Sequence, residues 1–380
     1  MFSDIPQFIS LNYVTAVYFQ IPSVTDKQNA TAFAEHLASV FQPFPSQLSV
    51  TEEETINNNL NVPHQIALPL KKIRINEVKN VIQYKIIPKK SPIYDLVTGK
   101  GLKEVSQKGL RAITQIYNAI PQTEYFPYQW KLEQIIMIVK PGKNPNDITS
   151  YRLISLLPIL SKILEKIFLN RLTPIIDENK LIPYHQFGFR KEHRTIEQAH
   201  SLVYKINDLE SKRYFSAAFI NISQAFDKVW HTGLLYKLKR AFPHPDYTLL
   251  QSYLTYRTFQ VRYQKEYTKL NTIQSGVPQG SILGPILYSI FTADLPLTEQ
   301  TLAATYADDT AILASHQNPI TASRKLQNYL NHFEKWLKRW RMKANENKST
   351  HVAFTLKREK CPSHTEWKPN SARRNCQIRT

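Results

Sequence analysis

The chain has 380 residues, more than one average domain and fewer than three, and 42% of them are hydrophobic. Such a chain can bury a large core, which excludes a peptide, a disulfide scaffold and a largely disordered protein. Lysine and arginine number 49 against 30 acidic residues, a formal net charge of +19. This excess predicts a polyanionic partner, above all nucleic acid, although a membrane-surface protein with a solvated cationic face would show the same balance.

The ends of the chain carry no targeting or metal signal. Cys361 and Cys376 are the two cysteines, and with His364 they offer only three loosely spaced ligands, so we expect neither a disulfide framework nor a zinc site. The first residues include Asp4 and lack the basic stretch of a secretory signal.

The uncharged stretch 271–293 contains Gly and Pro, which is wrong for a lipid-spanning helix. We expect an intracellular protein, in the nucleus, the cytoplasm or both, without a membrane partner.

The first predicted element is a helix over 25–41, where apolar residues recur at helical spacing behind Thr25, a candidate N-cap. Residues 42–65 are rich in Pro, Ser, Asn and Glu and predict a linker or loosely held arm. The segment 1–65 is therefore interpreted as an N-terminal linker or arm with one helix.

A mostly helical segment follows over 66–125. Helical spacing predicts helices within 75–86 and 102–120, separated by a turn-forming stretch rich in Lys, Gly and Pro.

From residue 130 the pattern changes. An apolar, β-prone run over 132–141 predicts a strand, and the Gly, Pro and Asn residues of 141–147 predict a turn. The segment 151–172 is interpreted as an amphipathic helix. Its apolar stripe consists of Leu160, Ile163, Leu164, Ile167, Phe168 and Leu172.

The second half of the chain alternates strands with helices, which predicts an α/β or α+β fold. Strands are expected over 216–222, 302–307 and 310–314, and a hairpin-like pair over 258–273. Helices are expected over 223–242 and 321–342.

The strongest local signal is Asp308–Asp309, two adjacent acids between apolar strands. Like charges this close repel each other unless cations lie between them. Two hard divalent cations would relieve the repulsion, and two-metal phosphoryl or nucleotidyl transfer needs such carboxylates. The alternative is an ordinary Asp-Asp turn, which is common in hairpins.

Three of the nine glycines, Gly276, Gly280 and Gly284, lie within nine residues. Their spacing is compatible with a close helix-packing face. With Pro278 and Gln279 between them, they also predict a loop that leads into a helix and brings bare backbone close to a base pair or template strand.

These blocks resemble the reverse transcriptases of non-LTR retrotransposons, most closely those of jockey-like elements. The likeness extends from about residue 25 to residue 356, and the order of the blocks makes chance negligible. The blocks with palm character are FINISQAFDKVWH (219–231), SGVPQGSILGPILYSIFTADLP (275–296), YADDTAILA (306–314) and WRMKANENKS (340–349). Those with fingers character are KPGKNPNDITSYRLISLLPILSKILEKI (140–167) and HQFGFRKEHRT (185–195).

The resemblance implies a right-hand polymerase fold that copies RNA into DNA with two Mg²⁺ ions, for which Mn²⁺ can substitute. The implied domain, 126–356, divides into fingers at about 126–212 and a palm at about 213–356. Its partners would be an RNA template, a DNA primer or an RNA–DNA hybrid, and deoxynucleoside triphosphates. The segment 66–125 would precede the fingers.

The resemblance also implies a metal site. Asp308 would ligate both ions, with Asp309 beside it, and Ile222 is assigned to the same site. Lys348, or alternatively Lys343, would donate a proton to the leaving pyrophosphate.

A nucleotide site is implied as well. Lys140 and Arg152 would neutralise the triphosphate, Phe226 would exclude a 2′-hydroxyl, and Gln279 with Gly280 would line the nascent base pair and template. For each of these cations the alternative is a solvated surface charge.

Asn221 departs from the family pattern, because the first palm motif normally carries a metal-binding Asp there. An amide has no charge and cannot bridge two dications as a carboxylate does, so we expect impaired catalysis, by at least roughly 10²–10³ in rate. Asp227 is not expected to replace it, since six residues of strand would place it about 20 Å away and even a turn into a helix would point it elsewhere. The alternative function is a catalytically inactive nucleic-acid-binding remnant.

Further departures indicate a truncated, degenerate copy. Leu153 and Ile93 stand where the family usually has Pro and Gly. Beyond 357 the likeness fades into an irregular basic tail, 357–380, where the next palm hairpin and the thumb are expected. We expect the endonuclease module to be absent and the thumb to be largely missing.

Overall fold

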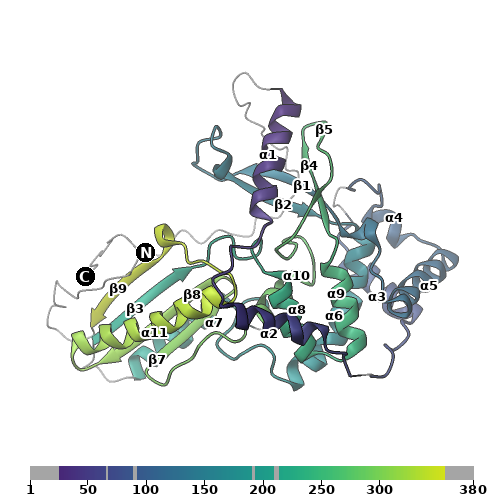
Figure 1. Ribbon diagram of the computed structural model, residues 1–380. Helices are drawn as coiled ribbons and strands as arrows, with labels where there is room; N and C mark the ends of the chain where they lie inside the picture. The colour runs from purple at the N-terminus through teal and green to yellow at the C-terminus, as the bar shows by residue number, and fades with distance from the viewer. Residues whose placement is uncertain (1–24, 66, 89–91, 191–192, 209–213, 356–380) are drawn as a thin grey trace.

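The computed structural model describes residues 25–65, 67–88, 92–190, 193–208 and 214–355. It confirms the mixed α/β class: two separate sheets are surrounded by helices (Figure 1). A single large apolar core runs beneath the helices and the second sheet, and a smaller one lies between the first sheet and the first helix.

The first sheet has the strand order β2-β1-β4-β5, and β6 also pairs with β4. Strands β1 and β2 are antiparallel, whereas β1 and β4 are parallel, so two segments far apart in sequence meet here. Helix α1 (Asp26–Val40) packs on this sheet through apolar residues such as Phe33 and Leu37. The strands are β1 (Leu132–Val139), β2 (Tyr151–Leu156), β4 (Thr258–Tyr263), β5 (Glu266–Tyr267) and β6 (Asn271–Thr272).

The second sheet is antiparallel throughout, with the order β7-β8-β3-β9. Helix α11 (Pro319–Arg339) packs against β3 and β8 and covers one face (Figure 1). On β3 Phe219 is 44% exposed, whereas Phe215 and Ala217 on the same face of the strand are buried, so this face is exposed only towards the end of β3. The strands are β3 (Tyr214–Asn221), β7 (Thr301–Tyr306), β8 (Asp309–His316) and β9 (Thr350–Thr355).

The remaining helices surround the sheets. They are α2 (Val50–Asn61), α3 (Ile75–Lys85), α4 (Gly99–Lys103), α5 (Gln107–Thr123), α6 (Ile159–Glu178), α7 (Thr195–Asp208), α8 (His231–Ala241), α9 (His244–Leu254) and α10 (Gly284–Phe291). Three 3₁₀ turns complete the described chain: η1 (Tyr128–Lys131), η2 (Ile148–Ser150) and η3 (Glu346–Lys348).

Helix α2 corrects the expectation of a loosely held arm over 42–65. Ser49 forms a capping box with Glu52, and Ile56 buries itself against the main core. The Lys239 ammonium donates to backbone carbonyls at the end of α2, and Arg341 pairs with Glu53. Polar composition concealed a helix whose stability depends on these tertiary partners.

Two predicted helices are shorter than expected. The first six residues of 151–172 form strand β2, because they pair with β1 across a turn, and the apolar stripe belongs to α6 alone. Residues 223–228 form turns, and helix α8 begins only at His231. Both differences reflect pairing partners that helical spacing does not encode.

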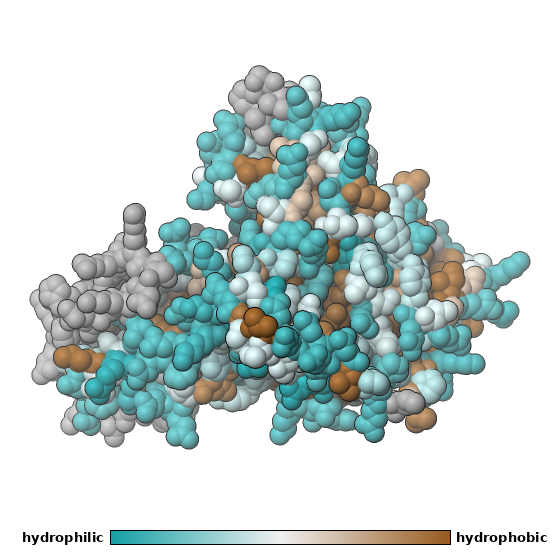
Figure 2. Space-filling model, in the orientation of Figure 1, coloured by the Kyte–Doolittle hydropathy of each residue, from teal (hydrophilic) through white to brown (hydrophobic). Residues whose placement is uncertain are grey.

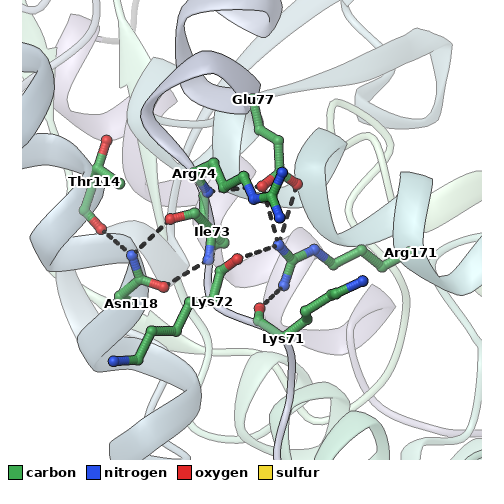
Figure 3. A network of polar contacts seen from close by, with 8 residues as sticks. All are labelled: Lys71, Lys72, Ile73, Arg74, Glu77, Thr114, Asn118 and Arg171. Carbon is green, nitrogen blue, oxygen red and sulfur yellow. Dashed lines mark hydrogen bonds and ion pairs between the residues drawn. The ribbon is translucent and has the colours of Figure 1, made fainter.

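A basic strap, residues 71–74, directly precedes α3 and is held through its backbone (Figure 3). The Arg171 guanidinium donates to the carbonyls of Lys71 and Lys72 and pairs with Glu77 at 3.1 Å. The Asn118 amide bonds both the N–H and the C=O of Ile73, at 2.7 and 2.9 Å. These contacts tie the strap to α5 and α6.

Hydrophilic residues dominate the face in Figure 2, and the apolar ones on it are scattered. Within the described residues, no helix is both long and apolar enough to cross a membrane.

Candidate active site

A cleft of about 1100 Å³ lies between the two sheets. Strands β1 and β2 form one wall, and the ends of β3 and the residues before β9 form another. Most of the predicted site residues line it: Lys140, Arg152, Asn221, Ile222, Phe226, Gln279, Asp308, Lys343 and Lys348. Chain segments about 200 residues apart in the sequence thus contribute to one cleft.

Asp308 lies in the two-residue turn between β7 and β8. Ala307, the other turn residue, has a φ of 57°, in the left-handed region that alanine seldom adopts. Asp308 is half-buried, whereas Asp309 is exposed at the start of β8. Burial raises the pKa of the Asp308 carboxyl, the neighbouring Asp309 charge raises it further, and the Lys348 charge opposes both. The turn holds two carboxylates that repel each other at the edge of the cleft.

Asn221 ends β3 directly opposite Asp309 on β8. Its backbone N–H donates to the Ser349 hydroxyl at 3.2 Å, and its carbonyl accepts from the Asn345 N–H at 2.7 Å. Among the residues that the structure describes, none forms a hydrogen bond with the side-chain amide. The amide is therefore available to the cleft.

Ile222 has a buried side chain, 5% exposed, so only its backbone carbonyl could serve as a metal ligand. Its bridge to Ala344 uses the carbonyl of Asn221 and the N–H of Ser223 and leaves the Ile222 carbonyl out of that pairing. The paired register of β3 and β8 ends at Asn221 and Asp309, and Ile222 follows directly after that pair.

These donors fit a hard divalent cation in kind, because carboxylate, amide and carbonyl oxygens are the ligands that Mg²⁺ takes in proteins. The set falls short in charge. Within the described part of the chain, no group of three or more His, Cys, Asp and Glu side chains could hold a metal ion, and the residue paired with Asp309 is Asn221, whose amide is uncharged.

Three cations line the cleft: Lys140 follows β1 and Arg152 lies on β2, whereas Lys348 lies on the opposite wall, just before β9. Burial lowers the pKa of Lys140, and the charges of Lys348 and Arg152 lower it further, so the three positive charges repel one another. The Lys140 ammonium donates to the Thr149 carbonyl at 2.7 Å. An anion bound among the three would relieve their repulsion.

Phe226 is held on two sides by aromatic rings. It stacks on Tyr288 of α10, with ring centroids 4.6 Å apart, and meets the edge of Phe189 at 5.8 Å. Such packing fixes the ring that lines the cleft.

Gln279 donates from Nε2 to the Asp227 carboxylate at 2.7 Å. Asp227 lines the same cleft as Asn221, because residues 223–228 fold into turns and not into the start of the helix that the sequence predicted over 223–242. Gly280 is not among the cleft-lining residues. A Cβ at position 280 would collide with the carbonyl oxygen of Ser155 on β2, so its bare backbone packs against protein, contrary to the expected contact with template.

The predicted loop into a helix is present at 275–284. Glu165, fully buried on α6, accepts hydrogen bonds from the N–H groups of Ile282 and Leu283 and from the Ser161 hydroxyl. The carboxylate therefore holds the loop in front of α10.

Sequence reasoning missed two residues that support the site, Glu165 and Gln186, and it considered Asp227 only as a substitute for the residue at position 221. Gln186 lies in the block 185–195, where its side chain bonds to Ala307 in the turn beside Asp308. The block 185–195 was identified in the sequence. Its contact with the turn joins residues 121 positions apart, and no local sequence pattern indicates such a contact.

Comparison with known proteins agrees with this geometry. The family model for reverse transcriptase (RNA-dependent DNA polymerase) matches residues 138–371, and so reaches past 356, where we placed the end of the domain. The chain is 44% identical to a probable RNA-directed DNA polymerase from transposon BS of Drosophila melanogaster, over 87% of this chain and 37% of that protein. It is 41% identical to the RNA-directed DNA polymerase from mobile element jockey of the same species, over 89% of this chain and 38% of that protein.

The chain thus spans less than two fifths of the length of these relatives. Reverse transcriptases generally use divalent metal ions, and they act with nucleotides on RNA or DNA templates. The match over most of the described sheets confirms the resemblance on which the fingers and palm were assigned. The chain belongs to the reverse transcriptase family, alongside the polymerases of jockey-type non-LTR retrotransposons.

Proposed function

We propose that the chain is an RNA-directed DNA polymerase domain, which adds deoxynucleotides to a DNA primer on an RNA template held in the cleft. One observation carries the proposal: the cleft brings the carboxylate of Asp308 together with the cations Lys140, Arg152 and Lys348. Nucleotidyl transfer requires at least carboxylates that bind metal ions and cationic groups that bind a triphosphate.

Two Mg²⁺ ions, or Mn²⁺, would be held by Asp308, Asp309, the Ile222 carbonyl and the Asn221 amide. When bound, such ions activate the primer hydroxyl and neutralise charge on the phosphates. Lys140 and Arg152 bind and orient the triphosphate, and the Lys348 ammonium donates a proton to the departing pyrophosphate oxygen.

The remaining residues select the substrate. Phe226 lies where a 2′-hydroxyl of the incoming nucleotide would meet its ring, and Gln279 faces the nascent base pair. Residues 126–212, which supply strands β1 and β2 of the first sheet, serve as fingers, and 213–356, which supply its strands β4 to β6 and the whole second sheet, serve as palm.

Extension of a DNA primer on an RNA template tests the proposal, with the unmodified chain beside Asn221→Asp and with Asp308→Asn as the inactive control. We expect Mg²⁺-dependent extension by the Asn221→Asp variant, weak extension by the unmodified chain, and none by the control. Absence of extension by Asn221→Asp, with Mg²⁺ and with Mn²⁺, would contradict the assignment.

A second candidate function is favoured by Asn221, which leaves the metal site one carboxylate short. In this case the chain binds nucleic acid but does not catalyse nucleotide addition. Binding of an RNA–DNA hybrid should then fall linearly in a log–log plot against salt, with a slope of several released counterions, while no metal ion binds. A flat salt response would contradict both functions, since both require contacts with phosphates.

A further inference from the structure

The segment 185–188 pairs with strand β7 just before the turn that carries Asp308. Gln186 forms a parallel bridge with Thr305. The Thr305 N–H donates to the His185 carbonyl, and the Phe187 N–H donates to the Thr305 carbonyl, both at 3.0 Å. A segment more than 100 positions before β7 in the sequence thus extends the edge of the second sheet, next to the turn that carries Asp308.

The Gln186 side chain also forms hydrogen bonds with the turn itself. Its Oε1 accepts from the Ala307 N–H at 3.1 Å and from the Gly188 N–H at 2.8 Å, and its Nε2 donates to the Ala307 carbonyl at 3.3 Å. Gln186 is only 3% exposed, so water does not compete for these bonds. One amide therefore bonds both the N–H and the C=O of a single turn residue.

Ala307 needs such support, because a φ of 57° lies in the left-handed region, which is unfavourable for an L-residue. The close approach also depends on Gly188, where a Cβ would collide with the Ala307 nitrogen. The Ala307 carbonyl belongs to the peptide unit that continues into Asp308. A bond to that oxygen restrains the backbone from which the Asp308 carboxylate projects.

We propose that Gln186 is a positioning residue, which fixes the Ala307–Asp308 peptide and thereby holds the Asp308 carboxylate ready for a divalent cation. The inference rests on the proposed function, since it assumes that Asp308 binds metal. Gln186 itself does not touch the reacting atoms. Its role is that of a residue that orients a metal ligand without binding the metal. Removal of such a residue typically lowers metal affinity by about 10–100-fold.

The test compares Gln186→Met, which removes all three bonds at similar volume, with Gln198→Met. Gln198 lies on α7 and donates to the His185 carbonyl at 3.2 Å, so its loss loosens the same segment without touching the turn. Direct Mn²⁺ binding is measured by the loss of the free-ion electron paramagnetic resonance signal, in the unmodified background and in Asn221→Asp. Melting temperature and RNA–DNA hybrid binding are measured on the same samples.

We expect Gln186→Met to weaken Mn²⁺ binding by about tenfold or more, with hybrid binding unchanged, and Gln198→Met to leave Mn²⁺ binding unchanged. If the Met variant does not fold, Gln186→Asn takes its place, because its amide is one methylene too short to bond both groups of Ala307. Unchanged Mn²⁺ binding in the position 186 variants, or an equal loss in Gln198→Met, would overturn this proposal alone. Failure of both parent chains to bind Mn²⁺ would overturn it together with the proposed metal site.

Discussion

Asn221 and Asp309 occupy directly opposite positions on the antiparallel strands β3 and β8. Cross-strand partners project from the same face of a sheet, so a carboxylate at position 221 would stand next to the Asp308–Asp309 turn. The amide that stands there supplies an oxygen but no charge.

Replacing Asn221 with Asp should strengthen Mg²⁺ binding by about tenfold or more, because a third carboxylate offsets the charge of the ions. Metal titration of both forms measures the effect. Mn²⁺, which is less strict about ligand geometry, should support the Asn form better than Mg²⁺ does. Asn347→Asp places the same charge at another position of the cleft lining and serves as control. Equal gains in both variants would mean that charge alone, and not ligation at position 221, sets the affinity.

Arg152→Ala, in an Asn221→Asp background, should raise the apparent KM for deoxynucleotides by about tenfold, since a charge-assisted bond to the triphosphate is lost. Steady-state extension kinetics measure the change, and hybrid binding should stay the same. Arg262→Ala, on β4 of the same sheet and stacked on Tyr267, is the matched control. Collapse of hybrid binding with an unchanged KM would place Arg152 on the nucleic-acid backbone instead.

Phe226→Ala, in the same background, should lower the discrimination between deoxynucleotides and ribonucleotides by about tenfold or more, because the ring no longer blocks the 2′-hydroxyl. The ratio of the two kcat/KM values measures it. Tyr288→Phe keeps the ring on which Phe226 stacks and should leave the ratio unchanged. A ratio that persists in Phe226→Ala would assign the exclusion of ribonucleotides to another residue.

Asp227 should make folding stability depend on pH. Burial raises the pKa of its carboxyl to about 7, so the folded chain holds a proton that the unfolded chain releases near pH 4. The free energy of unfolding should therefore fall as the pH rises from 4 to 7. Asp227→Asn keeps an oxygen for Gln279 and removes the ionisation, and it should be more stable than the parent at pH 8 by on the order of 3 kcal/mol.

Denaturant titrations of parent and variant at several pH values measure this difference. Burial lowers the pKa of His231 and of His185 to about 4, which destabilises the fold as the pH falls below 6.5, but both chains share those residues. The gap between the two chains therefore isolates Asp227. Asp177→Asn, an exposed substitution on α6, should show no such gap. A gap that stays constant from pH 4 to 8 would show that Asp227 is ionised throughout.

The amino-acid sequence by itself determined most strands of the two sheets, the long helices and the family, because these follow from short periodic patterns and from the order of local blocks. It did not predict strands β2 and β9. It also located Asp308, Asn221, Phe226 and the three cations, which the cleft brings together. It failed where polar composition concealed a helix, as in α2, and where a strand preceded a helix without a break, as in β2 and α6.

Only the tertiary structure decided how the site is supported. Gln186 meets Ala307 across 121 positions, Glu165 meets Ile282 across 117, and Gly280 fits against Ser155 on another strand. Each contact depends on where two distant backbones pass each other, and a local pattern of side chains carries no information about that distance. For the same reason the turns after Asn221, which return Asp227 to the cleft, could not be distinguished in the sequence from the start of a helix.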